Sequence, residues 1–150
     1  MYELGNRYYY SKMYDEAYSC YTNAYMKGHR KAGFMKILCI YNGTGTEKDE
    51  KSAFNELNKY LDSNFYSKAL ELLGEMYYYG HGVNQDYTKA YECFNEIQHE
   101  EKVAQYYLGI MYYNGDGIEK DVNKGMDYII KSASQRCKEA IDFIINNLKS

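Results

Sequence analysis

The sequence contains no proline and no tryptophan, and it has only three histidines and four cysteines among its 150 residues. The cysteines form no C-x-x-C pair and are too sparse for a disulfide framework, so we expect free thiols that are mostly buried. The histidines show no spacing typical of a zinc site. We therefore predict neither a metal site nor a cofactor.

Long apolar runs and strongly basic segments are also missing. No stretch reaches the ~20 apolar residues that span a bilayer, and the N-terminal MYELGNRYYY lacks the basic start and apolar core of a signal peptide. The formal net charge of −3 provides no field that would attract nucleic acid or an anionic membrane. We expect a cytoplasmic protein that binds neither, unless a leader has been removed from this chain.

A segment built around a G-x-G pair recurs along the chain. GEMYYYGHGVNQDYTKAYECF, residues 74–94, aligns with GIMYYNGDGIEKDVNKGMDYI, residues 109–129, and places Gly80 and Gly115 35 residues apart. The glycine pair of a third copy begins at Gly43, 37 residues before Gly80. A period of this length is typical of stacked helix hairpins.

Apolar residues at the helical spacing i, i+3, i+4 and i+7 lie on both sides of each glycine pair. Helices are predicted before the glycines over residues 32–41, 69–79 and 104–113, and after them over 51–61, 89–97 and 124–134. An earlier hairpin lacks the G-x-G insertion, because Leu4 and Ala17 stand 13 residues apart where Leu73 and Ala90 stand 17 apart. Residues 139–148 are predicted to form a lone first helix that caps the array.

The recurring residues suit turns and helix packing better than catalysis. A glycine after the first helix adopts a positive φ without strain, and Asp49, Asp86 and Asp121 stand where a carboxylate would cap the second helix. Glycines within the first helices, such as Gly74, permit close approach of the second helix. The chain lacks G-x-G-x-x-G, P-loop, EF-hand and G-x-S-x-G motifs. We predict no catalytic residues and no enzymatic activity.

The pattern A-x3-LG-x2-Y-x2-G-x-G-V-x2-D-x2-KA resembles the Sel1-like repeat. All of its positions are filled between Ala69 and Ala90, and the copy that begins at Ala104 departs only with Ile118 for valine and Gly125 for alanine. The segment GHRKA, residues 28–32, resembles the link between repeats of that family.

Two units match less well. The unit that begins at Ala32 is degenerate, because Lys36 and Ile37 stand where Leu-Gly is expected. The first unit resembles the related tetratricopeptide repeat in its spacing. The resemblance covers nearly the whole chain and implies an all-α, right-handed superhelical solenoid of stacked antiparallel helix hairpins. We expect one domain over residues 1–150, with units at about 1–28, 29–65, 66–100 and 101–135 and a capping helix at 136–150.

By resemblance, the protein is a non-catalytic scaffold that binds another protein or a peptide in a concave groove. Positions two before, two after and five after the leucine of the Leu-Gly pair share one face of the first helix, and in solenoids of this kind that face lines the groove. The residues predicted to bind the partner are Tyr9, Tyr41, Tyr78, Tyr113, Asn6, Leu38, Glu75, Ile110, Tyr106, Glu71 and Phe34.

Three alternatives remain open. The tyrosine rings in this set could simply pack against the neighbouring helix. The chain could be a small-ligand-binding or weakly catalytic member of the family, which would show one convergent pocket with a perturbed acid or histidine. It could also be a viral or bacterial module that uses the same groove to antagonise a host protein.

Overall fold

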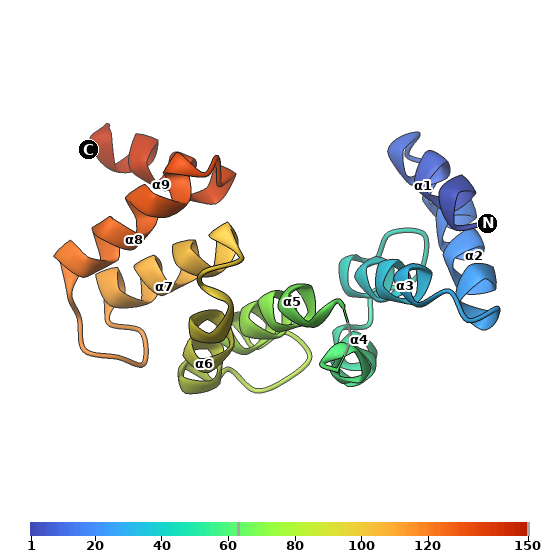
Figure 1. The fold of residues 1–150 in the computed structure, drawn as a ribbon, viewed down its shortest axis with the longest axis horizontal. Coiled ribbons are helices and arrows are strands. Elements are labelled where there is room, and N and C mark those ends of the chain that lie inside the picture. The colour runs from blue at the N-terminus through green and yellow to red at the C-terminus, as the bar shows by residue number, and fades with distance from the viewer. Residues whose placement is uncertain (63, 150) are drawn as a thin grey trace. The chain divides into compact units, whose positions relative to one another are not determined.

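The computed structural model describes residues 1–62 and 64–149 (Figure 1). Over these residues the chain forms nine α-helices and one short 3-10 helix, with no strand, which confirms the predicted all-α class. The helices belong to two compact units, Met1–Phe65 and Tyr66–Ser150. This division falls where the sequence pattern separates the second hairpin from the third.

Unit 1 contains two helix hairpins. Their helices are α1 (Tyr2–Tyr10), α2 (Tyr14–Met26), α3 (Arg30–Asn42) and α4 (Glu50–Leu57), and a 3-10 turn (Asn58–Tyr60) follows. Buried residues of α2 and α3, including Tyr21, Ala32 and Cys39, form one core cluster, so the two hairpins share their apolar interior. The helix predicted over 51–61 is present, although its last turn is 3-10 in form.

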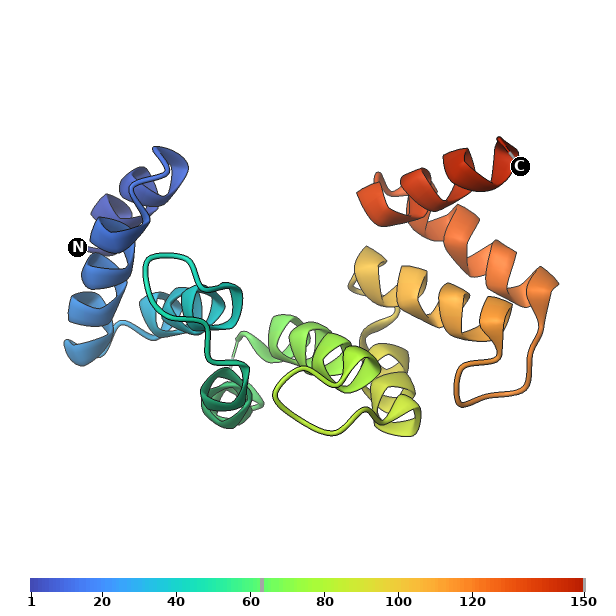
Figure 2. The same cartoon turned by 180° about the vertical axis from the view of Figure 1, so that it is seen from behind.

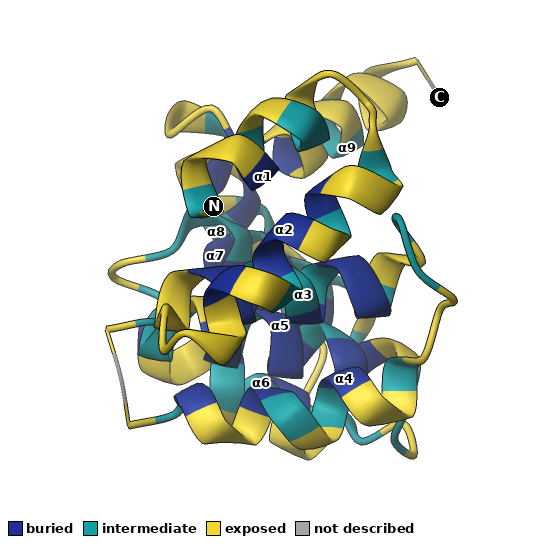
Figure 3. Cartoon of the chain, turned by 90° about the vertical axis from the view of Figure 1, so that its right-hand side faces the viewer, coloured by how far each residue is buried: buried dark blue, intermediate teal, exposed yellow. Residues whose placement is uncertain are grey.

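Unit 2 contains two hairpins and a final helix. Its helices are α5 (Tyr66–Tyr79), α6 (Tyr87–Ile97), α7 (Lys102–Asn114), α8 (Val122–Ser134) and α9 (Lys138–Leu148). The ring of Phe94 in α6 stacks on that of Tyr107 in α7, with centroids 4.6 Å apart. Ile129 of α8 is fully buried against Ala140 of α9, so α9 covers the last hairpin as a cap. In Figure 3, helices carry buried residues along one side and exposed residues along the other.

The G-x-G pairs form the long loops within hairpins that stand out in Figure 2. Gly80 and Gly82 have φ angles of 74° and 71°, and the glycines of the other two pairs are also in the left-handed region. The backbone N–H of Asp86 then donates to the carbonyl of Tyr77 at 2.9 Å and closes the loop. The predicted turn chemistry is confirmed.

The three loop aspartates cap the second helices as predicted. The carboxylate of Asp86 accepts a bond from the backbone N–H of Lys89 at 3.0 Å, and Asp49 and Asp121 make the equivalent bond. The hairpin without a G-x-G loop turns differently: Lys12, between α1 and α2, adopts a φ of 62°. A lysine there carries the strain that glycine avoids in the other hairpins.

Glycines in the first helices allow close packing. A Cβ atom added at Gly74 would lie 2.6 Å from Cε1 of Phe94, and one at Gly109 would lie 2.6 Å from Cγ1 of Ile129. The degenerate second hairpin has Ile37 at the glycine position and the smaller Leu57 at the Phe94 position, and both are buried. In this hairpin a larger residue at the glycine position is therefore matched by a smaller residue at the Phe94 position.

We predict that Asp86→Ala lowers the free energy of unfolding by about 1 kcal/mol, because it removes the cap of α6. Urea denaturation followed by circular dichroism measures this loss. Asn84→Ala, an exposed change in the same loop, is the matched control and leaves the unfolding free energy unchanged. Equal effects of the two substitutions would contradict the capping role.

We predict that Gly74→Ala destabilises the protein by about 1–3 kcal/mol, because the added methyl group overlaps the Phe94 ring. Phe94→Leu alone is also destabilising, because it leaves a cavity. Since the second hairpin pairs a large residue with leucine, the double variant is expected to lose less than the two single losses combined, with a coupling of about 1 kcal/mol. Additive losses in urea denaturation would show that the two positions do not compensate.

Candidate protein-binding surface

One side of α5 carries polar and aromatic residues that the hydrophobic core does not use. Lys68, Glu71, Glu75 and Tyr79 follow one another at spacings of three and four residues, so they lie along one stripe of the helix. The two glutamates are half-buried, whereas Tyr79 keeps 51% of its surface exposed. Lys68 and Tyr79 are the two exposed residues of α5, so this stripe is part of the surface of unit 2.

The lysine of the stripe is shared between two carboxylates. Its ammonium lies 3.4 Å from Oε2 of Glu71 and 2.6 Å from Oε2 of Glu101, which directly precedes α7. Both glutamate side chains are only 17% exposed. Lys68 is therefore fully engaged by these two acids.

Glu75 has no such partner. Within the described residues its carboxyl group makes no hydrogen bond and no ion pair. Burial, followed by the negative charges of Glu71 and Glu139, raises the pKa of Glu75 to about 7, although Lys68 acts in the opposite direction. The site thus contains a partly desolvated acid without a counter-ion.

Side chains of α7 and α9 continue this surface. Tyr106 and Ile110 of α7 and Phe143 of α9 are half-buried and pack against the same core cluster, and the ring of Tyr113 meets that of Phe143 edge-on at 5.2 Å. Burial raises the pKa of Tyr106, and Tyr79 and Glu139 add to the effect. We define the first-helix face of unit 2 as Glu71, Glu75, Tyr79, Tyr106, Ile110, Tyr113, Glu139 and Phe143.

Five of the predicted binding residues, Glu71, Glu75, Tyr106, Ile110 and Tyr113, are half-buried members of this face. Tyr78 is not, because only 9% of it is exposed. Its hydroxyl donates to Oδ2 of Asp116 at 2.7 Å, and its ring packs against Tyr87 and Tyr107. Tyr78 therefore joins neighbouring hairpins, as the packing alternative anticipated, and contributes little accessible surface.

The predicted residues of unit 1 divide in the same way. Phe34 is 7% exposed and stacks on Phe65 at 5.3 Å, so it belongs to the core. Asn6 is half-buried, and its Oδ1 accepts a hydrogen bond from the hydroxyl of Tyr21 at 2.9 Å. Tyr9 packs against the core cluster of this unit. Leu38 and Tyr41 are half-buried.

The sequence prediction missed Tyr79, the most exposed aromatic residue of the first-helix face of unit 2. Counting positions from a single leucine selected Tyr78 instead. The spacing of four residues from Glu71 to Glu75 and from Glu75 to Tyr79 could have identified it. Glu139 and Phe143 were missed because α9 was considered only as a cap.

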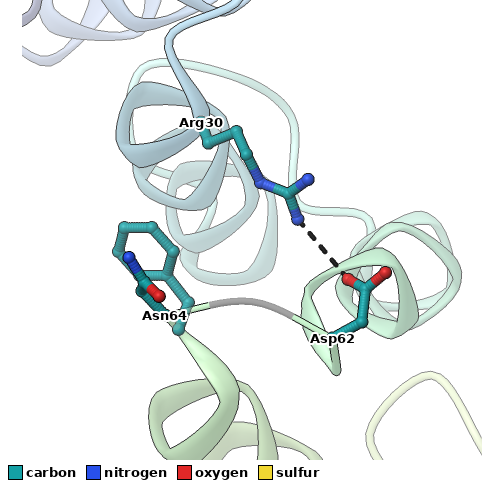
Figure 4. A pocket seen from close by; sticks show the side chains of 4 residues that line it. Arg30, Asp62 and Asn64 are labelled. Atoms are coloured by element: carbon teal, nitrogen blue, oxygen red, sulfur yellow. Dashed lines mark ion pairs between the residues drawn. The ribbon is translucent and has the colours of Figure 1, made fainter.

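A pocket of about 310 Å³ in unit 1 bears on the small-ligand alternative (Figure 4). It is lined by Arg30, Asp62, Asn64 and Phe65. The guanidinium of Arg30 lies 3.6 Å from Oδ1 of Asp62 and donates to the carbonyl of Lys59 at 3.2 Å. The charged groups of this pocket satisfy each other and are largely exposed, so the pocket does not favour a charged ligand.

A tyrosine of α7 and a lysine near the start of α8 form a polar pair outside the first-helix face. The ammonium of Lys124 donates to the hydroxyl of Tyr112 at 2.9 Å, and this bond lowers the pKa of Tyr112. Nζ of Lys124 also lies 4.0 Å from the centre of the Tyr112 ring, and this ring contact recurs one unit earlier, where Nζ of Lys89 lies 5.3 Å from the centre of the Tyr77 ring. Recurrence at equivalent positions indicates a packing role that belongs to the repeat.

The described residues contain neither a metal-binding cluster nor a membrane-spanning helix. Over residues 1–62 and 64–149, no group of three or more histidine, cysteine, aspartate or glutamate side chains could hold a metal ion. In the same part of the chain, no helix combines the length and the apolar character needed to cross a membrane.

Solved structures of other repeat proteins are similar to this fold. The chain is similar to a Sel1 repeat protein from Oxalobacter formigenes, with a TM-score of 0.71 and 28% identity over 86% of this chain and 53% of that one. It is also similar to a protective antigen of uropathogenic Escherichia coli strains with an SLR fold, with a TM-score of 0.67 and 25% identity over 85% of this chain and 27% of that one. The chain thus spans less than two thirds of either protein.

No curated protein matches the sequence. The family model described as the Sel1 repeat matches residues 31–55, 67–96 and 102–137, which together make up more than half of the chain. These matches contain the three G-x-G loops, the three capping aspartates and most of helices α3 to α8. The solenoid of helix hairpins predicted from the sequence is confirmed, and the chain belongs to the Sel1 repeat family.

Proposed function

We propose that the chain is a non-catalytic scaffold that binds a segment of another protein on the exposed faces of its first helices. The family fold supports this function, because stacked hairpins present a row of first helices to a partner. The side chains of the first-helix face of unit 2 also support this function. The residues of the repeat pattern are used for turns, caps and packing, whereas the first-helix face of unit 2 keeps an exposed Tyr79 beside an unpaired Glu75.

The side chains of this face suit protein recognition. A tyrosine ring offers a large apolar surface and a hydroxyl group at a low cost in conformational entropy, and tyrosine is enriched among the residues that dominate interface energies. Tyr79, Tyr106 and Tyr113 come from two neighbouring first helices of the same unit. In unit 1, Tyr9, Leu38 and Tyr41 are the corresponding candidates.

We expect Tyr79→Ala to weaken binding of the partner by about 2 kcal/mol, a roughly thirtyfold loss of affinity. The partner is first captured from extracts of the source cells with the wild-type chain, identified by mass spectrometry and purified. Its affinity for each variant is then measured by calorimetry, and circular dichroism melting confirms that the variant is folded.

Met26→Ala is the control, because Met26 is 78% exposed at the end of α2, a second helix, and lies outside the first-helix faces. It removes a large exposed side chain and leaves the affinity unchanged. Tyr113→Ala provides a second test on α7. Undiminished affinity in folded Tyr79→Ala and Tyr113→Ala variants would exclude this face as the binding surface.

A further inference from the structure

The first-helix face of unit 2 contains more negative than positive charge. Glu71 and Glu139 both act on the carboxyl group of Glu75, one from its own helix and one from α9. Lys68 is the one ammonium among the charged groups that act on Glu75, and Glu71 and Glu101 already share it. A further carboxylate on this face thus has no internal counter-ion.

Leaving Glu75 in this state is unfavourable for the isolated protein. A half-buried carboxylate loses part of its hydration, and without hydrogen bonds nothing in the fold replaces it. Two neighbouring acids add repulsion. A cation that reached this carboxylate would therefore gain more than it would from an acid exposed elsewhere on the surface.

Tyrosine side chains lie near this part of the face, and Tyr107 of α7 interacts electrostatically with Glu75. Tyr79 follows Glu75 by one helical turn, and the hydroxyl of Tyr107 in α7 donates to that of Tyr79 at 3.5 Å. Tyr106 of α7 is near both Tyr79 and Glu139. A ring face attracts an ammonium or guanidinium group and also packs against the aliphatic stem of lysine or arginine.

We propose that the first-helix face of unit 2 binds a basic segment of the partner protein and holds one of its lysine or arginine side chains between the Glu75 carboxylate and the rings of Tyr79 and Tyr106. This inference rests on the proposed function and specifies the chemistry of the partner. An acidic segment would bring like charges toward Glu71, Glu75 and Glu139, and an apolar segment would bury Glu75 without a counter-ion. A basic segment complements both the acids and the rings.

The pH dependence of binding follows from the groups that surround Glu75. Lys68 and Glu71 face it from α5, Tyr107 from α7 and Glu139 from α9. Because its pKa lies near 7, Glu75 becomes fully charged as the pH rises from 6 to 8, while a lysine of the partner keeps its charge. Binding of a basic segment is therefore stronger at pH 8 than at pH 6.

The test uses a fluorescent peptide of alternating lysine and glycine, and the same peptide with glutamine in place of lysine. Fluorescence anisotropy measures their affinities for the full chain at low ionic strength. We expect the lysine peptide to bind at least about tenfold more tightly than the glutamine peptide. Glu75→Gln should reduce the affinity for the lysine peptide about tenfold and remove its rise between pH 6 and pH 8.

Two controls make the result specific. Glu92→Gln makes the same change of charge on an exposed residue of α6 and should alter the affinity by no more than about twofold. His81→Gln is included because the imidazole stacks on the ring of Tyr79 at 5.3 Å, and the rise with pH should persist in this variant. Equal losses in Glu75→Gln and Glu92→Gln, or no binding of the lysine peptide by the wild-type chain, would overturn the proposal.

The stability of Glu75→Gln provides a second readout. The pKa of Glu75 is higher in the folded than in the unfolded chain, so this group stabilises the fold at low pH and that contribution is lost as the pH rises through about 7. Glu75→Gln should therefore melt at a higher temperature than the wild type at pH 8 and at the same temperature at pH 4. A lower melting temperature at pH 8 would contradict the unpaired state of the carboxylate.

The outcome also separates this inference from the proposed function. If the natural partner binds Tyr79→Ala weakly but binds Glu75→Gln as well as the wild type, the scaffold function stands. The inference that the partner presents a basic segment is then wrong. If Tyr79→Ala and Tyr113→Ala both bind the natural partner normally, the first-helix face of unit 2 is not the binding surface, and this inference fails together with that part of the proposed function.

Discussion

The close contact between the two helices of a hairpin is the constraint on which the rest of this fold depends. At Gly74 the first helix has no side chain, and the ring of Phe94 occupies that space and is fully buried. The same ring stacks on Tyr107 of the next hairpin with an angle of 3° between the ring planes. One missing side chain thus permits both the pairing of helices within a hairpin and the stacking of hairpins on each other.

Much of this architecture could be predicted from the sequence because its determinants are local. A positive φ at Gly80, a capping bond from Asp86 and the helical spacing of apolar residues each depend on a few neighbouring positions. The repeat then predicts the topology, because a hairpin that cannot bury its own apolar side must stack on a neighbouring hairpin. Helix ends were less well predicted, since the 3-10 turn after Leu57 has no clear sequence signal.

The surface residues were harder to predict because their burial depends on contacts between hairpins. Tyr78 and Tyr79 are adjacent in sequence, yet Tyr78 is buried by contacts with Tyr107 and Asp116 from the next hairpin while Tyr79 stays half exposed. Counting from the leucine of the Leu-Gly pair does not show which of two neighbouring tyrosines a later hairpin will cover. The environment of Glu75 also depends on α9, which lies more than sixty residues further along the chain.

The G-x-G loops have a consequence for the order of the repeats. Main-chain bonds close all three loops, because the residue between the glycines donates its backbone N–H to the same carbonyl of the first helix in each hairpin. Its side chain is therefore not needed for the turn, and it differs in every copy: Thr44, His81 and Asp116. In the last copy Asp116 accepts the hydroxyl of Tyr78 from the preceding hairpin. A hairpin with threonine or histidine at this position lacks the carboxylate that Tyr78 contacts, so the two hairpins of unit 2 are not interchangeable in this contact.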